Sequence, residues 1–429
     1  MILTKRWFQG MLPGWWLGDA DGRVGSPTVP PKVWDQRLSA SGFQGLHAVG
    51  LDSEPPFYYN ANMVAVASAD YVVPPKLSVA AATPILDRYA ALHASEPKGL
   101  GDGRPTAEQV LLDQNIRTED WKDRVILVTG GTAGIGAESV RVLHKTGAKI
   151  FITGRDGAKG EKLAQEMQAA RPSHPAVEMI TMDHMSLQSV RKGCAEFIER
   201  SKGKLNVLMC NAGIAFSPSP KTEDGFEAIF GINYLAVFLT VQLLTQALID
   251  STTPDFKSRL LVVSSAGHRA GNINPDDYNM EGPDGFSQPK AYAASKTGTI
   301  LMANEFDRKY APKGVRALSL NPGLILGTEI SRGLPGTPES RRPFLVKMEP
   351  LLESYEKSVP QGAATQVWAA IAKELEDQGG LYLDDCQVAV EAKFDGQMAR
   401  PGWKPHIWDE QMAKRVWADS LKLCGMESN

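Results

Sequence analysis

The sequence predicts an α/β protein with a doubly wound parallel sheet and a small α+β extension before it. From about residue 124 onward, short apolar β-branched runs alternate with amphipathic segments. A glycine-rich loop, TGGTAGIG at 129–136, follows the first of these runs. Alternating strands and helices imply right-handed crossovers, which cover a parallel sheet with helices on both faces. Residues 1–118 are instead rich in Pro, Gly, Ser and Ala.

The predicted elements follow one another in a regular order. The first strand, RVILVT at 124–129, precedes a helix, GAESVRVLHKTG at 136–147, and a second strand, KIFIT at 149–153. The next helix, KGEKLAQEMQAARP, is stopped by Pro172. Ligands of such a sheet bind at the carboxyl ends of its strands. Four more buried strands are predicted: VEMITM (177–182), LNVLMC (205–210), RLLVVS (259–264) and VRALSL (315–320).

The chain divides into three predicted parts. Residues 1–72 form the extension, 73–118 a linker, and 119–429 the large domain. The linker contains one predicted helix, TAEQVLLDQNI. The predicted elements of the extension are a turn (WWLGDADGR, 15–23), a helix (PPKVWDQRLSASG, 30–42) and two extended runs (LHAVGLDS, 46–53, and NMVAVASAD, 62–70).

Composition excludes several classes of protein. A net charge of −3 gives no basic field for nucleic acid or an anionic membrane. The four cysteines form no CxxC pair and the seven histidines have no ligand spacing, so we expect no metal site and reduced thiols. No apolar stretch follows Lys5 and Arg6 as in a signal peptide, and a cytoplasmic protein is therefore expected.

The longest apolar stretch, residues 231–249, resembles a membrane span only in composition. It contains Asn233, Gln242 and Gln246, whose amides hydrocarbon would leave unsatisfied. We therefore predict a buried helix or a helical subunit interface.

The glycine loop indicates dinucleotide binding of the Rossmann type. Glycines allow the backbone to turn sharply beside a pyrophosphate, and the following helix N-terminus offers free N–H groups. The second strand ends in TGRD, with Gly154 where an acid would bind a ribose 2′-hydroxyl. Arg155 suits a 2′-phosphate, so NADP(H) is preferred as cofactor over NAD(H). Asp156 either weakens this preference or only caps the next helix.

Tyr292 and Lys296 in AYAASK lie one helical turn apart on a common face. A phenol has a reference pKa near 10. A cation about 4 Å away in a partly screened site contributes roughly 4 kcal/mol, or about three pKa units. The pair therefore predicts a general acid–base with a lowered tyrosine pKa.

Six motifs in order carry a resemblance to the short-chain dehydrogenase/reductase superfamily. They are TGGTAGIG, CNAG (210–213), INYLAVF, VVSSAGH, YAASK and NPG. The resemblance covers about residues 120–390. The long gap between serine and tyrosine, with the late block QGAATQVWAAI…GGLYLDDCQVA, resembles the retinol-dehydrogenase-like branch common in fungal secondary metabolism.

The resemblance implies a role for each site residue. Tyr292 protonates the carbonyl oxygen, Ser265 (with Ser264 as the alternative) hydrogen-bonds it, Lys296 holds the ribose and lowers the tyrosine pKa, and Asn233 places a water. For the cofactor, the pyrophosphate is lined by Gly130, Thr132, Ile135 and Gly136. Arg155 binds the 2′-phosphate, Asp183 the adenine edge and Asn211 the adenosine ribose region. The nicotinamide is flanked by Ile325 and Thr328. The interval from Pro322 to Thr328 is one residue longer than the commonest form of that motif.

The same resemblance places the substrate between two segments. The loop at about 324–358 mixes aliphatic residues with Arg332, Arg341 and Arg342, and 271–290 is expected to form the other wall. This favours an apolar carbonyl compound, and whether the arginines touch it is left open. His184, His268 and Cys210 are expected to have no chemical role.

Residues 7–68 resemble the end of the C-methyltransferase domain of fungal polyketide synthases. The motif that binds S-adenosylmethionine is absent, so no methylation is expected. The segment is either a retained scar or a docking element for a synthase. We therefore predict an NADPH-dependent ketoreductase of a polyketide-like compound. The resemblance implies a homo-oligomer unless the N-terminal extension blocks one interface. The alternatives are alcohol oxidation, a non-redox cyclase or dehydratase, and a binding module recruited through 1–72.

Overall fold

The computed structural model describes residues 43–51, 61–67, 88–93, 96–282, 285–326, 328–331, 333, 336–348, 351–392 and 399–426. The chain divides into two compact units, Met1–Thr83 and Pro84–Asn429. Within the first, β1 (Phe43–Leu51) pairs antiparallel with β2 (Ala61–Ala67), where the two extended runs were predicted. The turn at 15–23, the helix at 30–42 and most of the methyltransferase-like segment lie outside the described residues.

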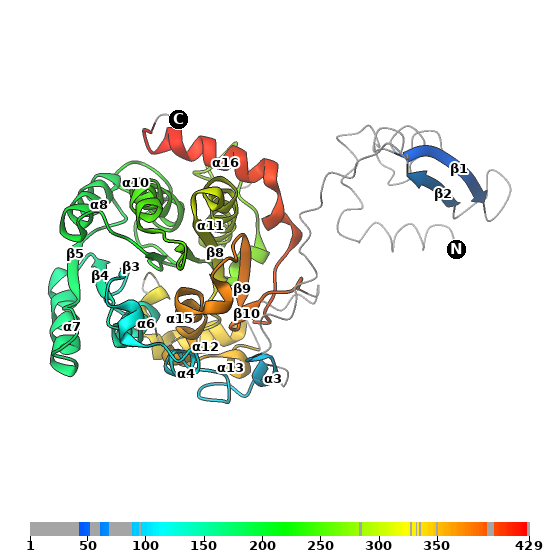
Figure 1. Cartoon of the computed structure of the whole chain (residues 1–429). Coiled ribbons are helices and arrows are strands. Elements are labelled where there is room, and N and C mark those ends of the chain that lie inside the picture. The colour runs from blue at the N-terminus through cyan, green and yellow to red at the C-terminus, as the bar shows by residue number, and fades with distance from the viewer. Residues whose placement is uncertain are drawn as a thin grey trace. The chain divides into compact units, whose positions relative to one another are not determined.

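The second unit is built on an eight-stranded sheet with the order β10-β9-β8-β7-β6-β3-β4-β5 (Figure 1). All neighbouring strands are parallel except β9 and β10. The chain runs outward from β3 to β5, then returns to β6 on the other side of β3. This reversal is the switch point of a doubly wound sheet and confirms the predicted fold. The strands are β3 (Val125–Thr129), β4 (Lys149–Gly154), β5 (Glu178–Thr181), β6 (Val207–Cys210), β7 (Ser258–Val263), β8 (Val315–Asn321), β9 (Leu381–Asp384) and β10 (Gln387–Val388).

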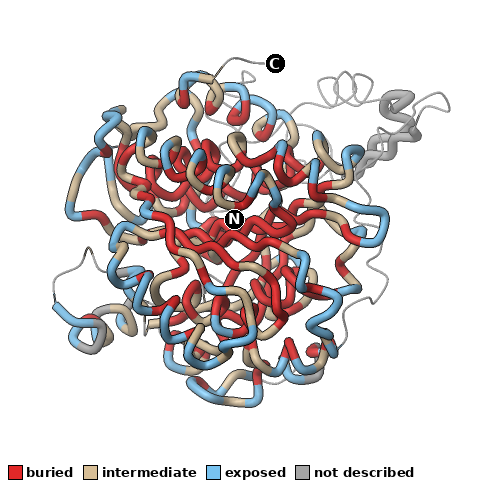
Figure 2. Tube along the Cα trace, turned by 60° about the vertical axis from the view of Figure 1, so that its left-hand side comes forward, coloured by how far each residue is buried: buried red, intermediate tan, exposed pale blue. Residues whose placement is uncertain are grey.

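Two helical layers cover the sheet (Figures 1 and 2). Side chains of β3 alternate between them: Ile126 and Val128 join one apolar core, Val125 and Leu127 the other. This alternation is the period of a strand buried on both faces. One layer contains α6 (Gly134–Leu143), α7 (Gly157–Ala170) and α15 (Ala364–Ile371); the other contains α8 (Leu187–Ser201), α10 (Ala236–Ser251), α11 (Gln288–Tyr310) and α16 (Glu410–Leu423).

The apolar stretch at 231–249 lies within a continuous helical segment, Ala228–Ser251. It comprises α9 (Ala228–Phe230), a π-helical turn (Gly231–Leu235) and α10. By length and composition it passes for a membrane span, but 89% of its most apolar window is buried in the protein. It packs against α8 and α11, as a core helix does.

Three C-terminal elements of this unit have no predicted counterpart. β9 and β10 extend the sheet beyond β8, and α16 packs along α11. On α16, the Trp417 ring lies 5.1 Å from Phe238 of α10, and Ser420 hydrogen-bonds the Tyr234 hydroxyl at 2.8 Å. The C-terminal helix therefore completes the core on this face.

The chain between Pro84 and the first strand of the sheet belongs to this unit. It contains α3 (Ala90–His93), α4 (Ala107–Asp113) and α5 (Thr118–Trp121). Ala107 and Val110 of α4 are fully buried in the core shared with α15, and Tyr89 is nearly so. The helix that the sequence places in a linker is thus packed onto the sheet domain, because its apolar side needs a partner surface.

Candidate active site

A cavity of about 870 Å³ lies along the carboxyl edge of the sheet, where the loops after β3 to β8 meet. Every predicted site residue lines it except Asn233. The strand order explains this gathering. Arg155 follows β4 on one side of β3, and Ser265 follows β7 on the other. An elongated ligand bound across the switch point reaches both.

The glycine loop forms a cradle in which glycines keep the backbone accessible. Gly130 has φ +64°, a conformation that favours glycine. A Cβ on Gly136 would lie 2.3 Å from the Gly130 carbonyl oxygen. The Asn211 amide fixes the loop by donating to the carbonyls of Thr129 at 3.0 Å and Gly130 at 3.1 Å. Since α6 begins here, the cradle and the free N–H groups fit a pyrophosphate.

The end of β4 presents two cations to the cavity. Arg155 and Lys159 are both exposed and both line it. Asp156 caps α7, its Oδ1 accepting from the Lys159 backbone N–H at 3.0 Å, and it also lines the cavity. A Cβ on Gly154 would lie 2.8 Å from the Thr132 methyl, so an acidic side chain at this position would require Thr132 to move. Lys159 was not predicted from the sequence, although it lies four residues after Arg155.

Two residues after β5 border the cavity. The Asp183 carboxylate accepts from the Met185 N–H at 3.0 Å. The His184 ring is buried, donates from Nδ1 to the Ile232 carbonyl at 3.2 Å, and has its pKa lowered by burial. His184 is therefore a neutral side chain of the wall that ties β5 to the π-helical turn.

Ser265, Tyr292 and Lys296 lie together at the far side of the cavity. Ser264 points away, because its hydroxyl donates to the Lys296 carbonyl at 2.8 Å. Ser265 hydrogen-bonds the Tyr292 side chain. The structure thus places Ser265, not its neighbour, beside the tyrosine.

The pKa shift of Tyr292 beside Lys296 differs from the sequence prediction. The Lys296 ammonium donates to the Val263 carbonyl at 2.9 Å and lies 5.7 Å from the centre of the Tyr292 ring. Burial raises the pKa of Tyr292, and the Ser265 hydrogen bond only opposes this. Burial also lowers the pKa of Lys296 to about 8. The predicted lowering of the tyrosine pKa is wrong for this state of the chain, because the ammonium is directed at a backbone carbonyl.

Asn233 lies behind the cavity wall in the π-helical turn, a feature frequent at functional sites. Its amide donates to the Ile214 carbonyl at 2.8 Å and to Ser295 Oγ at 3.1 Å, and its Oδ1 accepts from the Ile214 N–H at 2.8 Å. A Cβ on Gly213 would lie 3.2 Å from Asn233 Oδ1 and 3.5 Å from Lys296 Nζ. The two side chains therefore border one small space.

The part of the cavity beyond the tyrosine is walled mainly by apolar side chains. The helices α12 (Pro338–Met348) and α13 (Leu352–Tyr355) contribute to it, which agrees with the predicted loop at 324–358. Met185, Ala215 and Phe216 were not predicted from the sequence. The apolar residues that line this part are Met185, Ala215, Phe216, Leu324, Leu326, Ile330, Leu345, Leu352 and Ala399.

The predicted second wall is wrong for the described residues of 271–290, none of which lines the cavity. The Tyr278 ring stacks 5.1 Å from Phe230 and its hydroxyl donates to Asp419 at 3.0 Å, so the segment is held against α9 and α16. Arg341 and Arg342 do not line the cavity either, and Arg332 lies outside the described residues.

His268 and Cys210 contribute no group to the cavity. His268 is fully buried, donates to the Ser265 carbonyl at 2.7 Å, and has its pKa lowered to about 3 by burial. Burial raises the pKa of the Cys210 thiol, which leaves it unreactive.

Comparison with known proteins agrees with this architecture. Residues 124–337 match the family described as short chain dehydrogenase. Oxidoreductase calI of Penicillium decumbens is 66% identical over 343 residues, which cover 80% of this chain and 99% of that protein. Human retinol dehydrogenase 13 is 32% identical over 307 residues, covering 71% of this chain and 86% of that protein.

Among solved structures, an uncharacterised protein from Mycobacterium Paratuberculosis has a TM-score of 0.52 and 26% identity, and the match covers 72% of this chain and 98% of that one. The ordered motifs, the doubly wound sheet and these matches establish that the chain belongs to the short-chain dehydrogenase/reductase family of oxidoreductases, in its retinol-dehydrogenase-like branch.

Proposed function

We propose that this chain is an NADPH-dependent reductase that converts a ketone on an apolar, polyketide-like secondary metabolite into a secondary alcohol. The observation that carries the proposal is the single cavity that has Arg155 and Lys159 at one end and Ser265 and Tyr292 at the other. The family as a whole uses NAD(P)(H). The preference for the phosphorylated form rests on the two cations and on Gly154, which places no carboxylate at the end of β4.

At the reacting end, each side chain has a definite task. NADPH, when bound, supplies the hydride that reaches the carbonyl carbon. The Tyr292 hydroxyl gives its proton to the carbonyl oxygen, and Ser265 donates a hydrogen bond that orients this oxygen. Burial raises the pKa of Tyr292, so the phenol keeps the proton that the reduction requires. The reverse oxidation would use the same hydroxyl as a base.

The substrate class follows from the wall around this end. Its side chains are mostly aliphatic, joined by the thioether of Met185 and the aromatic ring of Phe216, and they favour an apolar carbonyl compound over a sugar or a small acid. The polyketide class depends in addition on the resemblance of residues 7–68 to a synthase domain. Contact with a synthase through residues 1–72, a homo-oligomer and a cytoplasmic location belong to the same proposal.

Replacing Arg155 by Ala is expected to weaken NADPH binding about 10- to 30-fold, because a charge-assisted hydrogen bond to a phosphate contributes about 1.5–2 kcal/mol. NADH binding is expected to change less than about twofold, since no 2′-phosphate is present. Fluorescence titration of both cofactors measures this.

The matched control is Lys162→Ala, an exposed cation of α7 outside the cavity, which should leave both affinities unchanged. Lys159→Ala should show a smaller loss for NADPH than Arg155→Ala. Equal weakening of NADPH and NADH in Arg155→Ala, or tighter binding of NADH by the unaltered chain, would contradict the assignment.

A further inference from the structure

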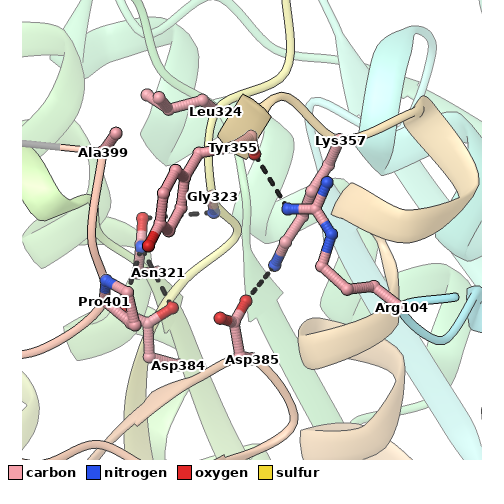
Figure 3. A pocket seen from close by; sticks show the side chains of 10 residues that line it. All are labelled: Arg104, Asn321, Gly323, Leu324, Tyr355, Lys357, Asp384, Asp385, Ala399 and Pro401. Carbon is pink, nitrogen blue, oxygen red and sulfur yellow. Dashed lines mark hydrogen bonds and ion pairs between the residues drawn. The ribbon is translucent and has the colours of Figure 1, made fainter. Parts of the chain in front are cut away.

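Arg104 is a buried arginine outside the large cavity, in a part of the chain that precedes the family match. Its side chain is only 4% exposed and pairs with Asp102 at 2.7 Å. The guanidinium donates to three backbone carbonyls, those of Tyr355 at 2.9 Å, Glu356 at 2.6 Å and Gly99 at 3.1 Å. Figure 3 shows Arg104 directed at the Tyr355 carbonyl. One side chain thus connects residues 99–104 with residues 355–356, about 250 residues further along the chain.

Residues 96–104, here called the strap, make further bonds to the same region. The Gly99 N–H donates to the Ser354 carbonyl at 2.7 Å. The Tyr355 hydroxyl donates to Glu96 at 3.1 Å. Gln361 of α14 (Val359–Gly362) donates to the carbonyls of Asp102 and Arg104, each at 3.1 Å. The strap is therefore bonded to both ends of the segment 354–361, at residues 354–356 and at Gln361.

The bonded segment in turn fixes the apolar wall of the cavity. The Lys357 N–H donates to the Leu324 carbonyl at 2.7 Å. The buried Glu356 carboxylate pairs with Arg342 of α12. Leu324, together with Leu345 of α12 and Leu352 of α13, lines the cavity. A displacement of residues 354–357 therefore moves three parts of the wall together.

Below this wall, Lys357 forms an ion pair with Asp385, and its side chain packs on Gly323 (Figure 3). Asn321, the last residue of β8, connects Gly323 to the loop that carries Ser265. Its amide donates to both oxygens of Asp384 at 3.1 Å, and its Oδ1 accepts from the Ala266 N–H at 3.1 Å, next to Ser265. The region that the strap holds is thus continuous with the turn that carries the reacting serine.

We propose that the strap sets the shape of the substrate wall and that Arg104 is its positioning residue. This inference rests on the proposed reductase function for the identity of the substrate, whereas the contacts of Arg104 do not depend on that function. A planar guanidinium donates to three carbonyls and one carboxylate at once, which an ammonium cannot do in the same arrangement. Without Arg104, the carbonyls of Tyr355 and Glu356 lose their buried donor, and the wall loosens while the cofactor cradle stays intact.

The test compares the full chain with Arg104→Met, Arg104→Lys and the control Arg117→Met. Arg117 is an exposed arginine of the same N-terminal region, with a side chain 71% exposed. Four quantities are measured: hydrogen exchange by peptide, NADPH affinity, and the KM and kcat for acetophenone as probe ketone. In Arg104→Met, exchange is expected to rise at 338–348 and 351–362 but not at 124–143. KM should rise at least about tenfold, equivalent to about 1.4 kcal/mol, with kcat within about threefold and NADPH affinity within about twofold.

Arg104→Lys is expected to lie between the unaltered chain and Arg104→Met, and Arg117→Met to change nothing. Should Arg104→Met not fold, Tyr355→Phe removes only the bond to Glu96 and should show the same pattern at smaller amplitude. Unchanged hydrogen exchange at 351–362, or an equal rise in exchange at 124–143, overturns the proposal that the strap positions the substrate wall. An unaltered chain that reduces no ketone refutes the reductase proposal alone, since the exchange comparison still decides the role of Arg104.

Discussion

Replacing Tyr292 by Phe is expected to lower ketone reduction about a thousandfold. The substitution removes one oxygen, and with it the proton that the carbonyl oxygen must receive. A positioned general acid contributes typically about 10² to 10⁴ in rate, and a thousandfold loss corresponds to about 4 kcal/mol of activation free energy. NADPH affinity should stay within about twofold, because the phenyl ring keeps its place against Gly267. Initial rates of NADPH oxidation with a probe ketone, beside a fluorescence titration, measure both quantities.

The matched control is Tyr310→Phe, at the other end of the same helix and outside the cavity. It should retain full activity. A Tyr292→Phe variant that kept more than about a tenth of the rate would contradict the assignment of Tyr292 as the proton donor.

Replacing Gly136 by Ala is expected to weaken binding of either dinucleotide about a hundredfold or more. The added Cβ would stand 2.3 Å from the Gly130 carbonyl oxygen and 2.5 Å from the Asn211 amide nitrogen. Both neighbours belong to the cradle itself, so the loop must move. A hundredfold loss corresponds to about 2.7 kcal/mol, within the range of about 1–3 kcal/mol for overpacking a tight site. Fluorescence titration gives the affinities, and a thermal melt without cofactor reports any general loss of stability.

Gly103→Ala is the comparison for this prediction. Its Cβ would meet nothing within 4 Å, and its φ lies outside the left-handed region. Affinity for NADPH should not change in this variant. A Gly136→Ala chain that binds NADPH normally would show that the dinucleotide does not lie in the cradle.

The predicted fold came from the strands that are buried on both faces. Runs such as VILVT have no polar alternation and lie between helices, and this pattern specifies a parallel sheet. β9 escaped prediction because its four residues, LYLD, include only three apolar ones and end at Asp384, which another acid, Asp385, follows. Its identity as a strand depends on pairing with β8, which is a tertiary contact.

The site was predictable where chemistry depends on local spacing. Tyr292 and Lys296 share a helix, and the glycine loop lies between a strand and a helix, so short patterns place them. Arg104 has no such signal, because its partners lie about 250 residues further along the chain. Residues 271–290 were misplaced for the same reason, since Tyr278 is held by distant aromatic and acidic partners.

The wrong pKa prediction for Tyr292 has an instructive cause. Helical spacing fixes where the Lys296 backbone lies, but not where its ammonium points. The Val263 carbonyl binds that ammonium at 2.9 Å, and burial then dominates the titration of the phenol. Sequence spacing therefore identified the right pair and gave the wrong sign of the shift.

The most direct test of the reductase proposal is to follow the hydride itself. The full chain is incubated with acetophenone and with NADPH that carries deuterium at its transferable position, and the alcohol is analysed by mass spectrometry. We predict one deuterium on the carbinol carbon, formed faster with NADPH than with NADH and lost in Tyr292→Phe. Tight NADPH binding with no deuterated alcohol from acetophenone or from a panel of larger apolar ketones would contradict the assignment of this chain as a ketone reductase.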